Sequence, residues 1–429
     1  MVEFMETIEI RPLPHPLDAT VIMPGSKSHT QRAIILAAIA AGESILQNPL
    51  DSEDTSYLIA ALKSLGADIS SRDGDLYIAG NGGRLADPGK ELYLGNNGTA
   101  MRILTGLVAI GPGDFTLTGD DRLRERPIEP LLAALRKLGV NARGRDREGY
   151  PPVLIRTSGL RGGTVILRDI ESSQYISSLL ISAPYAAGDT LIELAGRIPS
   201  LPYVNMTIAA IKEFGVEVQT EVPCRYRVQG NQCYRGISCR IEGDVSSASY
   251  FFLAAALCRG KIRVENVNLQ SLQGDIGFLS LLEDAGCFVN RKGNGVELIG
   301  RPLPGGDLVF DLKDMPDMVP TLAVLSALRP GRTVIANVAH LRLKESDRLA
   351  AVATELKKTG IHVEERRDSL VITGGQPRVA EIETYNDHRI AMSFAILGLA
   401  VPGMKIKNPT CVDKSFPGFW KELDKLYHK

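Results

Sequence analysis

Polar and charged side chains recur where helices of this chain are predicted to begin. Six such starts precede apolar helical runs. They begin at Lys27-Ser28, Asn97-Gly98-Thr99, Ser172-Ser173-Gln174, Ser246-Ser247, Asp317 and Asp387-His388-Arg389. The first turn of a helix attracts anions, because it offers unpaired N–H groups and about half a positive charge. Starts that converge would form a site for phosphate or carboxylate groups.

Helix capping is the competing explanation, because Ser, Thr, Asn and Asp are the residues that cap helices. It is the preferred reading for Ser246 and Ser247. It does not explain Lys27 or Arg389, because a cation is disfavoured at a helix N-terminus. Further basic residues lie in loops near these starts: Arg122, Arg124, Arg126, Lys344, Arg348 and Lys414. A solvated surface is the usual place for such residues, yet their recurrence favours one shared anion site.

The chain as a whole carries no excess of positive charge. Its 429 residues include 49 Lys and Arg against 50 Asp and Glu, a formal net charge of −1. Binding to nucleic acid or to an anionic membrane is therefore not indicated. The chain has no apolar run of the roughly 20 residues that cross a membrane, and its N-terminus lacks the apolar segment of a secretory signal. We expect a cytoplasmic protein.

Motifs for other chemistries are missing. The GSKS segment resembles a phosphate loop, but Thr20 stands where that motif requires its first glycine. No GxGxxG follows a predicted strand, and no GxSxG is present. The six histidines and six cysteines show no metal-ligand spacing. We expect no metal and no cofactor.

An internal repeat organises the elements that position these residues. The six segments, counted from Gly25, Asn96, Ser172, Asp244, Pro316 and Asp387, lie 71 to 76 residues apart. Helix ends at Leu65-Gly66, Leu138-Gly139, Phe214-Gly215, Ala285-Gly286 and Thr359-Gly360 repeat with a similar spacing. Two independent markers with one period indicate six related units.

Each unit has the pattern of a β-α-β-α-β-β subdomain. In the first, we expect strands at Ala19–Met23, Ser44–Leu46, Asp68–Ser70 and Leu76–Ala79, and helices at Ser28–Ala41 and from Ser52 to Gly66. The sixth unit lacks its closing strands, and a strand at Thr7–Arg11 is left over at the other end. We therefore expect that strand to complete the last units.

This arrangement predicts an α/β fold of two lobes with three units each. One lobe spans 25–243, and the other combines 1–24 with 244–429. The chain would cross between them near 24–25 and 243–244, where two neighbouring segments containing Gly25 and Gly243 could serve as a hinge.

Ten segments together resemble the 5-enolpyruvylshikimate-3-phosphate synthase family. They are PGSKSHTQRA, LGNNGTAMR, RERPI, SSQY, PSLPY, EGDVSSASYFFLAAA, MPDMVPTLAV, LRLKESDRL, YNDHRIAM and CVDKSFP, in order from about residue 20 to 420. The resemblance implies two lobes of three βαβαββ units, an inside-out α/β barrel arrangement. It also implies transfer of the enolpyruvyl group of phosphoenolpyruvate to the 5-hydroxyl of shikimate 3-phosphate.

The resemblance further implies roles for individual residues. The shikimate 3-phosphate ligands would be Lys27, Ser28, Arg32, Ser172, Ser173, Gln174, Ser200, Asp317, His340 and Lys344. The phosphoenolpyruvate ligands would be Lys27, Gly98, Arg126, Gln174, Arg348, Arg389 and Lys414. Three positions depart from common members: His340 replaces Asn beside the shikimate site, and Asn97 and Ile103 replace Ala and Pro of GNAGTAMRP.

The chemistry requires at least two proton carriers, because the methylene carbon gains a proton while the hydroxyl loses one and both transfers reverse. We assign Asp317 to the hydroxyl. Glu345 or Lys27 would act on the methylene, and the sequence does not divide this role between them. We expect a monomer, with the two small molecules as its partners.

Two alternatives remain open at this point. A UDP-N-acetylglucosamine enolpyruvyl transferase shares the architecture and the donor, but that family uses a cysteine in a loop of its N-terminal half. No cysteine precedes Cys224 here. A non-catalytic binding protein on the same scaffold would have lost a clamp or carboxylate, and none is missing.

Overall fold

The computed structural model describes residues 6–221, 224–292 and 295–428. The chain divides into two compact units, Gly25–Ile241 and the combination of Met1–Pro24 with Glu242–Lys429. We call them the N-terminal and the C-terminal unit. The chain passes between them at 24–25 and 241–242, against 24–25 and 243–244 in the sequence-based expectation. No helix among the described residues is long and apolar enough to cross a membrane.

The N-terminal unit contains three four-stranded sheets with one topology. Their orders are β14-β3-β5-β4, β6-β7-β9-β8 and β10-β11-β13-β12. In each sheet the first two strands are parallel and the other neighbours are antiparallel. The strands are β3 (Ala41–Gln47), β4 (Asp68–Arg72), β5 (Asp75–Asn81), β6 (Leu92–Tyr93), β7 (Pro112–Thr118), β8 (Asn141–Gly144), β9 (Val153–Ser158), β10 (Gly163–Arg168), β11 (Thr190–Ala195), β12 (Val218–Glu221), β13 (Arg225–Val228) and β14 (Ser238–Arg240).

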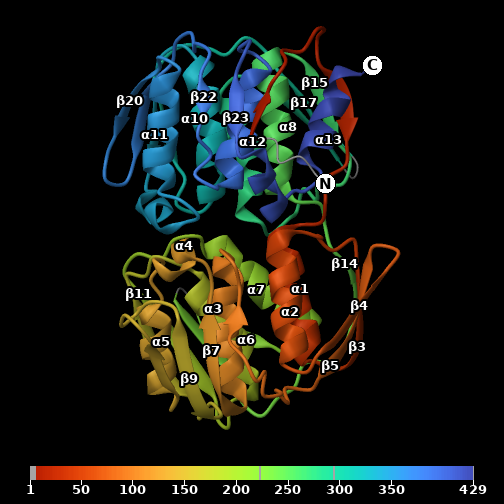
Figure 1. The fold of residues 1–429 in the computed structure, drawn as a ribbon, viewed down its shortest axis with the longest axis vertical. Coiled ribbons are helices and arrows are strands. Elements are labelled where there is room, and N and C mark those ends of the chain that lie inside the picture. The colour runs from red at the N-terminus through yellow and green to blue at the C-terminus, as the bar shows by residue number, and fades with distance from the viewer. Residues whose placement is uncertain (1–5, 222–223, 293–294, 429) are drawn as a thin grey trace. The chain divides into compact units, whose positions relative to one another are not determined.

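Buried helices form the core of this unit. The helices are α1 (Lys27–Ile39), α2 (Glu53–Ser64), α3 (Gly98–Leu107), α4 (Asp121–Arg124), α5 (Glu129–Lys137), α6 (Gln174–Ser182) and α7 (Leu201–Glu213). In α1 every residue from Thr30 to Ile39 is buried. Such a helix must be covered on all sides, and α1 packs against β3, β5, α2 and α7 (Figure 1). Short α4, capped by Asp120, lies where the sequence analysis expects a loop with Arg122 and Arg124.

Among its described residues, the C-terminal unit has two four-stranded sheets of the same topology, β16-β17-β15-β2 and β18-β19-β21-β20, and one three-stranded sheet, β1-β23-β22. The strands are β1 (Thr7–Glu9), β2 (Asp18–Val21), β15 (Lys261–Val264), β16 (Phe288–Lys292), β17 (Gly295–Ile299), β18 (Leu308–Asp311), β19 (Arg332–Ala336), β20 (His362–Glu365), β21 (Leu370–Thr373), β22 (Glu381–Ile382) and β23 (Lys405–Lys407). Strand β1 pairs antiparallel with β23, so the N-terminal strand completes the last sheet as the sequence analysis expects.

One strand assignment from the sequence is wrong. The segment predicted to open the first unit forms β2, which pairs in parallel with β15 of the fourth unit. Strand β14 takes the place beside β3. The first and fourth units have therefore exchanged their opening strands: β2, before the first unit, belongs to the fourth, and β14, before the fourth, belongs to the first. Local patterns of hydrophobicity cannot reveal such an exchange.

Helices α8, α10 and α12 lie at the centre of the C-terminal unit. The helices of this unit are α8 (Val245–Cys258), α9 (Phe278–Asp284), α10 (Val319–Leu328), α11 (Arg348–Lys358), α12 (His388–Gly398) and α13 (Phe419–Asp424). Helices α8, α10 and α12 pack against one another (Figure 1). Thr321 lies 3.4 Å from both Ser249 and Ser393, oxygen to oxygen. Each of these residues follows the previous one by 72 positions in the sequence. The sequence repeat therefore appears in the structure as three helices that pack through equivalent positions. The two-lobed α/β fold is confirmed.

Candidate active site

Three predicted site residues of the C-terminal unit lie at helix starts. Asp317 lies in a 3₁₀ turn (Pro316–Met318) directly before α10. Arg348 is the first residue of α11, and Arg389 is the second of α12. Asp387 caps α12 by accepting a hydrogen bond of 3.0 Å from the Arg389 backbone N–H. The cap neutralises the helix end, so a cation can occupy its first turn.

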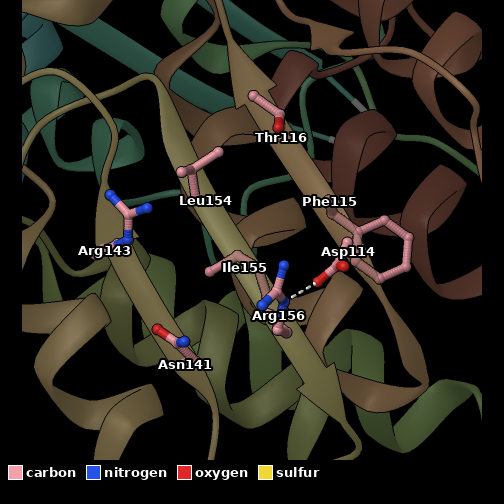
Figure 2. A pocket seen from close by; sticks show the side chains of 8 residues that line it. All are labelled: Asp114, Phe115, Thr116, Asn141, Arg143, Leu154, Ile155 and Arg156. Atoms are coloured by element: carbon pink, nitrogen blue, oxygen red, sulfur yellow. Dashed lines mark hydrogen bonds and ion pairs between the residues drawn. The ribbon is translucent and has the colours of Figure 1, made fainter.

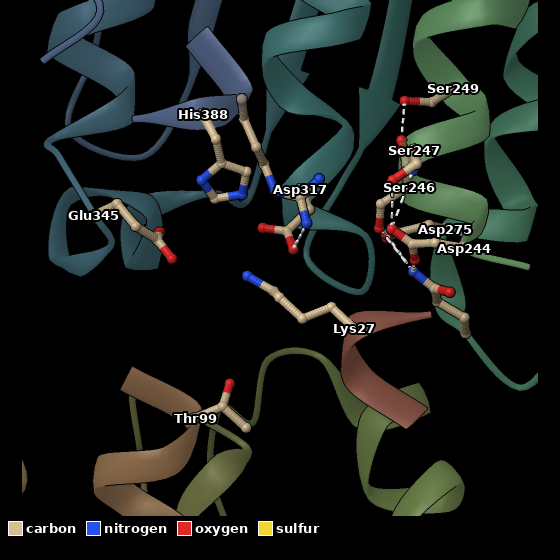
Figure 3. Close-up of polar contacts among 12 residues, drawn as sticks. Lys27, Thr99, Asp244, Ser246, Ser247, Ser249, Asp275, Asp317, Glu345 and His388 are labelled. Carbon is tan, nitrogen blue, oxygen red and sulfur yellow. Dashed lines mark hydrogen bonds and ion pairs between the residues drawn. The ribbon is translucent and has the colours of Figure 1, made fainter. Parts of the chain in front are cut away.

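Two arginines hold the carboxylate of Asp317. Arg348 Nη1 donates to Oδ1 at 2.8 Å, and Arg389 Nη2 donates to Oδ2 at 2.7 Å. Arg348 also donates from Nη2 to Glu345 at 2.7 Å and from Nε to Asp387 at 2.8 Å. Its side chain is 1% exposed. Figure 3 shows Asp317 and Glu345 at this cluster. Sequence reasoning named four of the five residues; it placed Asp387 at the helix start but gave it no partner.

This arrangement keeps Asp317 ionised. Burial, the largest single effect, opposes ionisation of the carboxyl. The charges of Arg389, Lys344 and Arg348 outweigh burial and hold the pKa of Asp317 well below its usual range. An unliganded Asp317 is therefore a stable anion bound to two cations.

A second polar cluster surrounds the start of α8 (Figure 3). Asp244, the cap, accepts from the Ser247 N–H at 3.2 Å and from the Ser247 hydroxyl at 2.8 Å. Gln273 Nε2 donates to Asp244 at 3.0 Å and to the Ser246 oxygen at 2.7 Å. Ser246 in turn donates to Asp275. The interpretation of Ser246 and Ser247 as helix caps is therefore wrong: Asp244 caps α8, and both serines lie in its first turn with their hydroxyls bonded to carboxylates.

Asp275 is a titratable group that the sequence analysis did not select. Its residue is fully buried. Burial first, and then the charge of Asp317, raises the pKa of Asp275 to about 6, against the effect of Arg389. Asp275 lies in a 3₁₀ turn (Gly274–Gly277) before α9, and no local pattern connects it with α8.

In the N-terminal unit, Lys27 at the start of α1 forms an ion pair. Its Nζ lies 3.1 Å from Asp54 Oδ2 in the first turn of α2. Asn97, the cap of α3, donates from Nδ2 to the Asp54 carbonyl at 2.8 Å. Asp54 therefore joins the starts of three helices. Asp54 is not among the site residues predicted from the sequence.

The side-chain amide of Gln174 is fixed at both ends. Arg102 Nη1 donates to its Oε1 at 2.9 Å, and its Nε2 donates to Thr99 at 2.8 Å. Ser172 Oγ accepts from the Gln174 backbone N–H at 3.3 Å, and Ser173 is buried beside it. Arg102 was not predicted as a site residue, although it lies one helical turn after Gly98.

Gly98 lies directly beneath the guanidinium of Arg126. A Cβ at Gly98 would lie 2.4 Å from Arg126 Nη2, too close for any side chain. Arg126 Nη1 also donates to the Asn96 carbonyl at 3.3 Å and to its side-chain oxygen at 3.2 Å. A side chain at position 98 would therefore displace the guanidinium of Arg126.

Arg32 is bonded within its own unit. Its Nε donates to Thr207 at 2.8 Å, and its Nη1 and Nη2 donate to the carbonyls of Ser28 and Tyr203 at 2.9 and 3.3 Å. Burial lowers the pKa of Arg32 to about 10. Ser200, which caps α7 with a left-handed backbone, is also buried.

The other predicted residues of the C-terminal unit are His340, Lys344 and Lys414. His340 is buried in a 3₁₀ turn (Ala339–Leu343) that Lys344 ends. Lys414 is buried at the end of another 3₁₀ turn (Pro409–Lys414), which packs against α12.

Two hollows of about 200 and 230 Å³ lie on open sheet faces of the N-terminal unit. Figure 2 shows the first, where Arg156 pairs with Asp114. Neither hollow contains a predicted site residue. Within the described ranges, we find no group of three His, Cys, Asp or Glu side chains placed to hold a metal ion.

Comparison with known proteins is consistent over the whole chain. Residues 13–423 match the family model of EPSP synthase (3-phosphoshikimate 1-carboxyvinyltransferase). A 3-phosphoshikimate 1-carboxyvinyltransferase of Nostoc punctiforme is 42% identical over 97% of this chain and 98% of its own length. One of Syntrophobacter fumaroxidans is also 42% identical, over 96% and 97%.

A solved structure supports the same grouping. The EPSP synthase of Acinetobacter baumannii superposes with a TM-score of 0.81 at 28% identity, covering 98% of both chains. The sequence match, the matching fold and the clusters of helix starts agree, and this chain belongs to the EPSP synthase family.

Proposed function

We propose that this protein transfers the enolpyruvyl group of phosphoenolpyruvate to the 5-hydroxyl of shikimate 3-phosphate, with release of phosphate. The carrying observation is the carboxylate of Asp317 held between Arg348 and Arg389. A reaction between two anionic molecules needs cations that bind acid groups and a carboxylate that moves a proton. Membership of the EPSP synthase family supports the same reaction.

The proposed ligand sets follow the family resemblance. Arg348, Arg389 and Lys414 bind phosphoenolpyruvate from the C-terminal unit, and Lys27, Gly98, Arg126 and Gln174 bind it from the N-terminal unit. Shikimate 3-phosphate is bound by Lys27, Ser28, Arg32, Ser172, Ser173, Gln174, Ser200, Asp317, His340 and Lys344. The fixed amide of Gln174 and the buried position of Arg348 support these roles, because both groups are held in place before a ligand arrives.

The reaction proceeds by addition and then elimination. The 5-hydroxyl oxygen bonds to C2 of phosphoenolpyruvate and gives its proton to Asp317, while C3 takes a proton from Glu345 or Lys27. In the second step C3 returns a proton to Glu345 or Lys27, the C2–O bond to phosphate breaks, the departing phosphate takes the proton held by Asp317, and the enol ether forms. Arg348 and Arg389 stabilise the carboxylate and phosphate charges through both steps.

Asp317 must exchange partners to act as a base. Both of its oxygens accept from arginines in the unliganded protein. A phosphoenolpyruvate anion that accepts from Arg348 and Arg389 would release the Asp317 carboxylate toward the hydroxyl. Loss of these two donors raises the affinity of Asp317 for a proton, so substrate binding prepares the base.

The product formed from two acceptors tests this function. The protein is incubated with phosphoenolpyruvate and either shikimate 3-phosphate or UDP-N-acetylglucosamine, and the products are identified by mass spectrometry. We expect an enolpyruvyl ether of shikimate 3-phosphate alone. An enolpyruvyl product of the nucleotide sugar alone would overturn the assignment.

Three further expectations accompany the proposal: a cytoplasmic location, a monomeric state and competition of glyphosate with phosphoenolpyruvate. Gel filtration with light scattering tests the second, and inhibition kinetics test the third.

A further inference from the structure

A buried carboxylate remains outside the proposed reaction. Glu355 lies in α11 and its side chain is 0% exposed. Its Oε1 accepts from the Tyr385 hydroxyl at 2.7 Å, and its Oε2 accepts from the Glu383 backbone N–H at 3.1 Å. Lys358 Nζ lies 2.7 Å from Oε2, but its side chain is 39% exposed. An exposed lysine offsets little of the cost of a buried charge. We therefore attribute the buried position of Glu355 to its hydrogen bonds with Tyr385 and Glu383.

Glu355 and Arg348 point to the same segment. They lie seven residues apart, which is two turns of α11, so both occupy one face of the helix. Arg348 donates to both oxygens of Asp387, at 2.8 and 3.2 Å. The chain from Glu383 to Asp387 is therefore bound to α11 at both ends, by a carboxylate at one and a guanidinium at the other.

This segment adopts a costly backbone conformation. Tyr385 and Asn386 have φ values of 54° and 53°. The left-handed conformation is disfavoured for Tyr, whereas Asn adopts it more readily. Such a conformation persists only when its surroundings hold it. Asn386 accepts from Asn408 Nδ2 at 3.2 Å, and Tyr385 is held by Glu355. The segment ends at Asp387, the cap of the helix that carries Arg389.

We propose that Glu355 and Tyr385 are a positioning pair that sets the guanidinium groups of Arg348 and Arg389 through the 383–387 segment. The bond between them fixes the backbone before Asp387. Asp387 in turn orients Arg348 directly and Arg389 through its backbone N–H. This proposal rests on the proposed function, in which both arginines bind phosphoenolpyruvate. Neither Glu355 nor Tyr385 touches the substrate.

The test compares Tyr385→Phe, Glu355→Gln and the double variant with the wild-type protein. Tyr385→Phe removes one hydroxyl from a residue that is 39% exposed, so this variant should fold even if Glu355→Gln does not. Tyr427→Phe is the matched control, because the Tyr427 hydroxyl donates to the Arg11 carbonyl elsewhere in the same unit. For each protein, kcat, both KM values and the unfolding midpoint are measured.

Each single variant should raise KM for phosphoenolpyruvate about tenfold, the loss expected for a hydrogen bond to a charged group. KM for shikimate 3-phosphate should change less than about twofold. Gln has one acceptor oxygen where Glu355 uses two, for Tyr385 and for the Glu383 N–H. The double variant should therefore raise KM by less than the product of the two single changes, because Tyr385→Phe already removes the bond that the pair shares. An unchanged KM for phosphoenolpyruvate, additive effects, or an equal rise of both KM values would overturn the positioning role. Absence of turnover in the wild-type protein would instead overturn the function itself.

Discussion

At the residue scale, the site consists of charges that are already paired. Asp317 is bound by Arg348 and Arg389, and Lys27 is bound by Asp54. Pairing offsets part of the cost of burying each charge and keeps the side chains in fixed positions. An anionic substrate must therefore replace protein carboxylates rather than enter an empty cationic pocket.

Replacing Asp317 by Asn tests the proton transfer. Asn keeps the volume and one acceptor but removes the base, so turnover should fall roughly 10²-fold or more while shikimate 3-phosphate still binds. Steady-state kinetics and calorimetry measure the two effects. Asp18→Asn, which breaks an exposed ion pair with Lys261 in the same unit, should leave both unchanged. Near-normal turnover of Asp317→Asn would remove Asp317 from the mechanism.

Replacing Gly98 by Ala tests the contact with Arg126. The added methyl would displace the guanidinium, whose Nη2 lies 2.4 Å from the Cβ position. We expect a raised KM for phosphoenolpyruvate together with weaker inhibition by glyphosate, both from inhibition kinetics. Gly111→Ala is a suitable control, because its nearest neighbour would lie 3.9 Å away. Unchanged values for Gly98→Ala would show that this glycine serves only the helix start.

Residue types alone indicated which groups could bind anions, but not their partners. Arg389 was identified because a cation at a helix start needs an explanation. Arg348 was identified as one of several basic residues in loops near such starts, whereas it is the first residue of α11. Asp275, Arg102 and Glu355 were missed, since each interacts with a residue 29 or more positions away. Such contacts depend on tertiary packing, and no local periodicity encodes them.

At the element scale, the repeat was readable because each unit reuses the same helix start and the same close packing. The exchange of β2 and β14 was not readable, because β14 is a three-residue strand with two exposed polar residues and no apolar run that would mark it in the sequence. The start of α8 shows how far an element depends on distant residues. Its cap, Asp244, is next to the helix in sequence. The carboxylate that accepts from the Ser246 hydroxyl belongs to Asp275, which lies 29 positions further along the chain.

Asp275 should make stability depend on pH. Its pKa is about 6 in the folded protein and about 3.9 in an unfolded chain. The folded state thus binds the proton more tightly, so this contribution is full below about pH 4 and is lost as the pH rises through 6. Asn does not titrate, so the Asp275→Asn variant does not lose this contribution. Its free energy of unfolding relative to that of the wild type should therefore rise between pH 4 and 7.

Denaturant unfolding at several pH values measures this difference. Asp284→Asn, at an exposed position at the end of α9, is the control and should show a constant difference. A constant difference for Asp275→Asn as well would contradict the raised pKa.

At the scale of the whole molecule, the chain joins its two units twice, at 24–25 and 241–242. The two segments are neighbours, because the Asp244 N–H donates to the Pro24 carbonyl at 2.9 Å. A few residues at such crossings can absorb a change in dihedral angles. The fold of each unit was predictable from the repeat, whereas motion between units needs a solution measurement.

Small-angle scattering tests that motion. In the proposed function, cations of both units bind the same anions, so like charges would favour separation without a ligand and a bound anion would reverse that preference. We therefore expect saturating shikimate 3-phosphate to lower the radius of gyration before phosphoenolpyruvate is added. An unchanged radius, with binding established by calorimetry, would exclude the hinge and leave the enzymatic assignment intact.

Release of inorganic phosphate tests the central claim most directly. The wild-type protein is mixed with phosphoenolpyruvate and shikimate 3-phosphate, and phosphate is followed with time; mixtures lacking one substrate, or containing shikimate without its phosphate, serve as controls. We predict continuous release that requires both substrates and yields one enolpyruvyl ether per phosphate. Release without shikimate 3-phosphate, or no release above the controls, would contradict the enolpyruvyl transfer proposed for this protein.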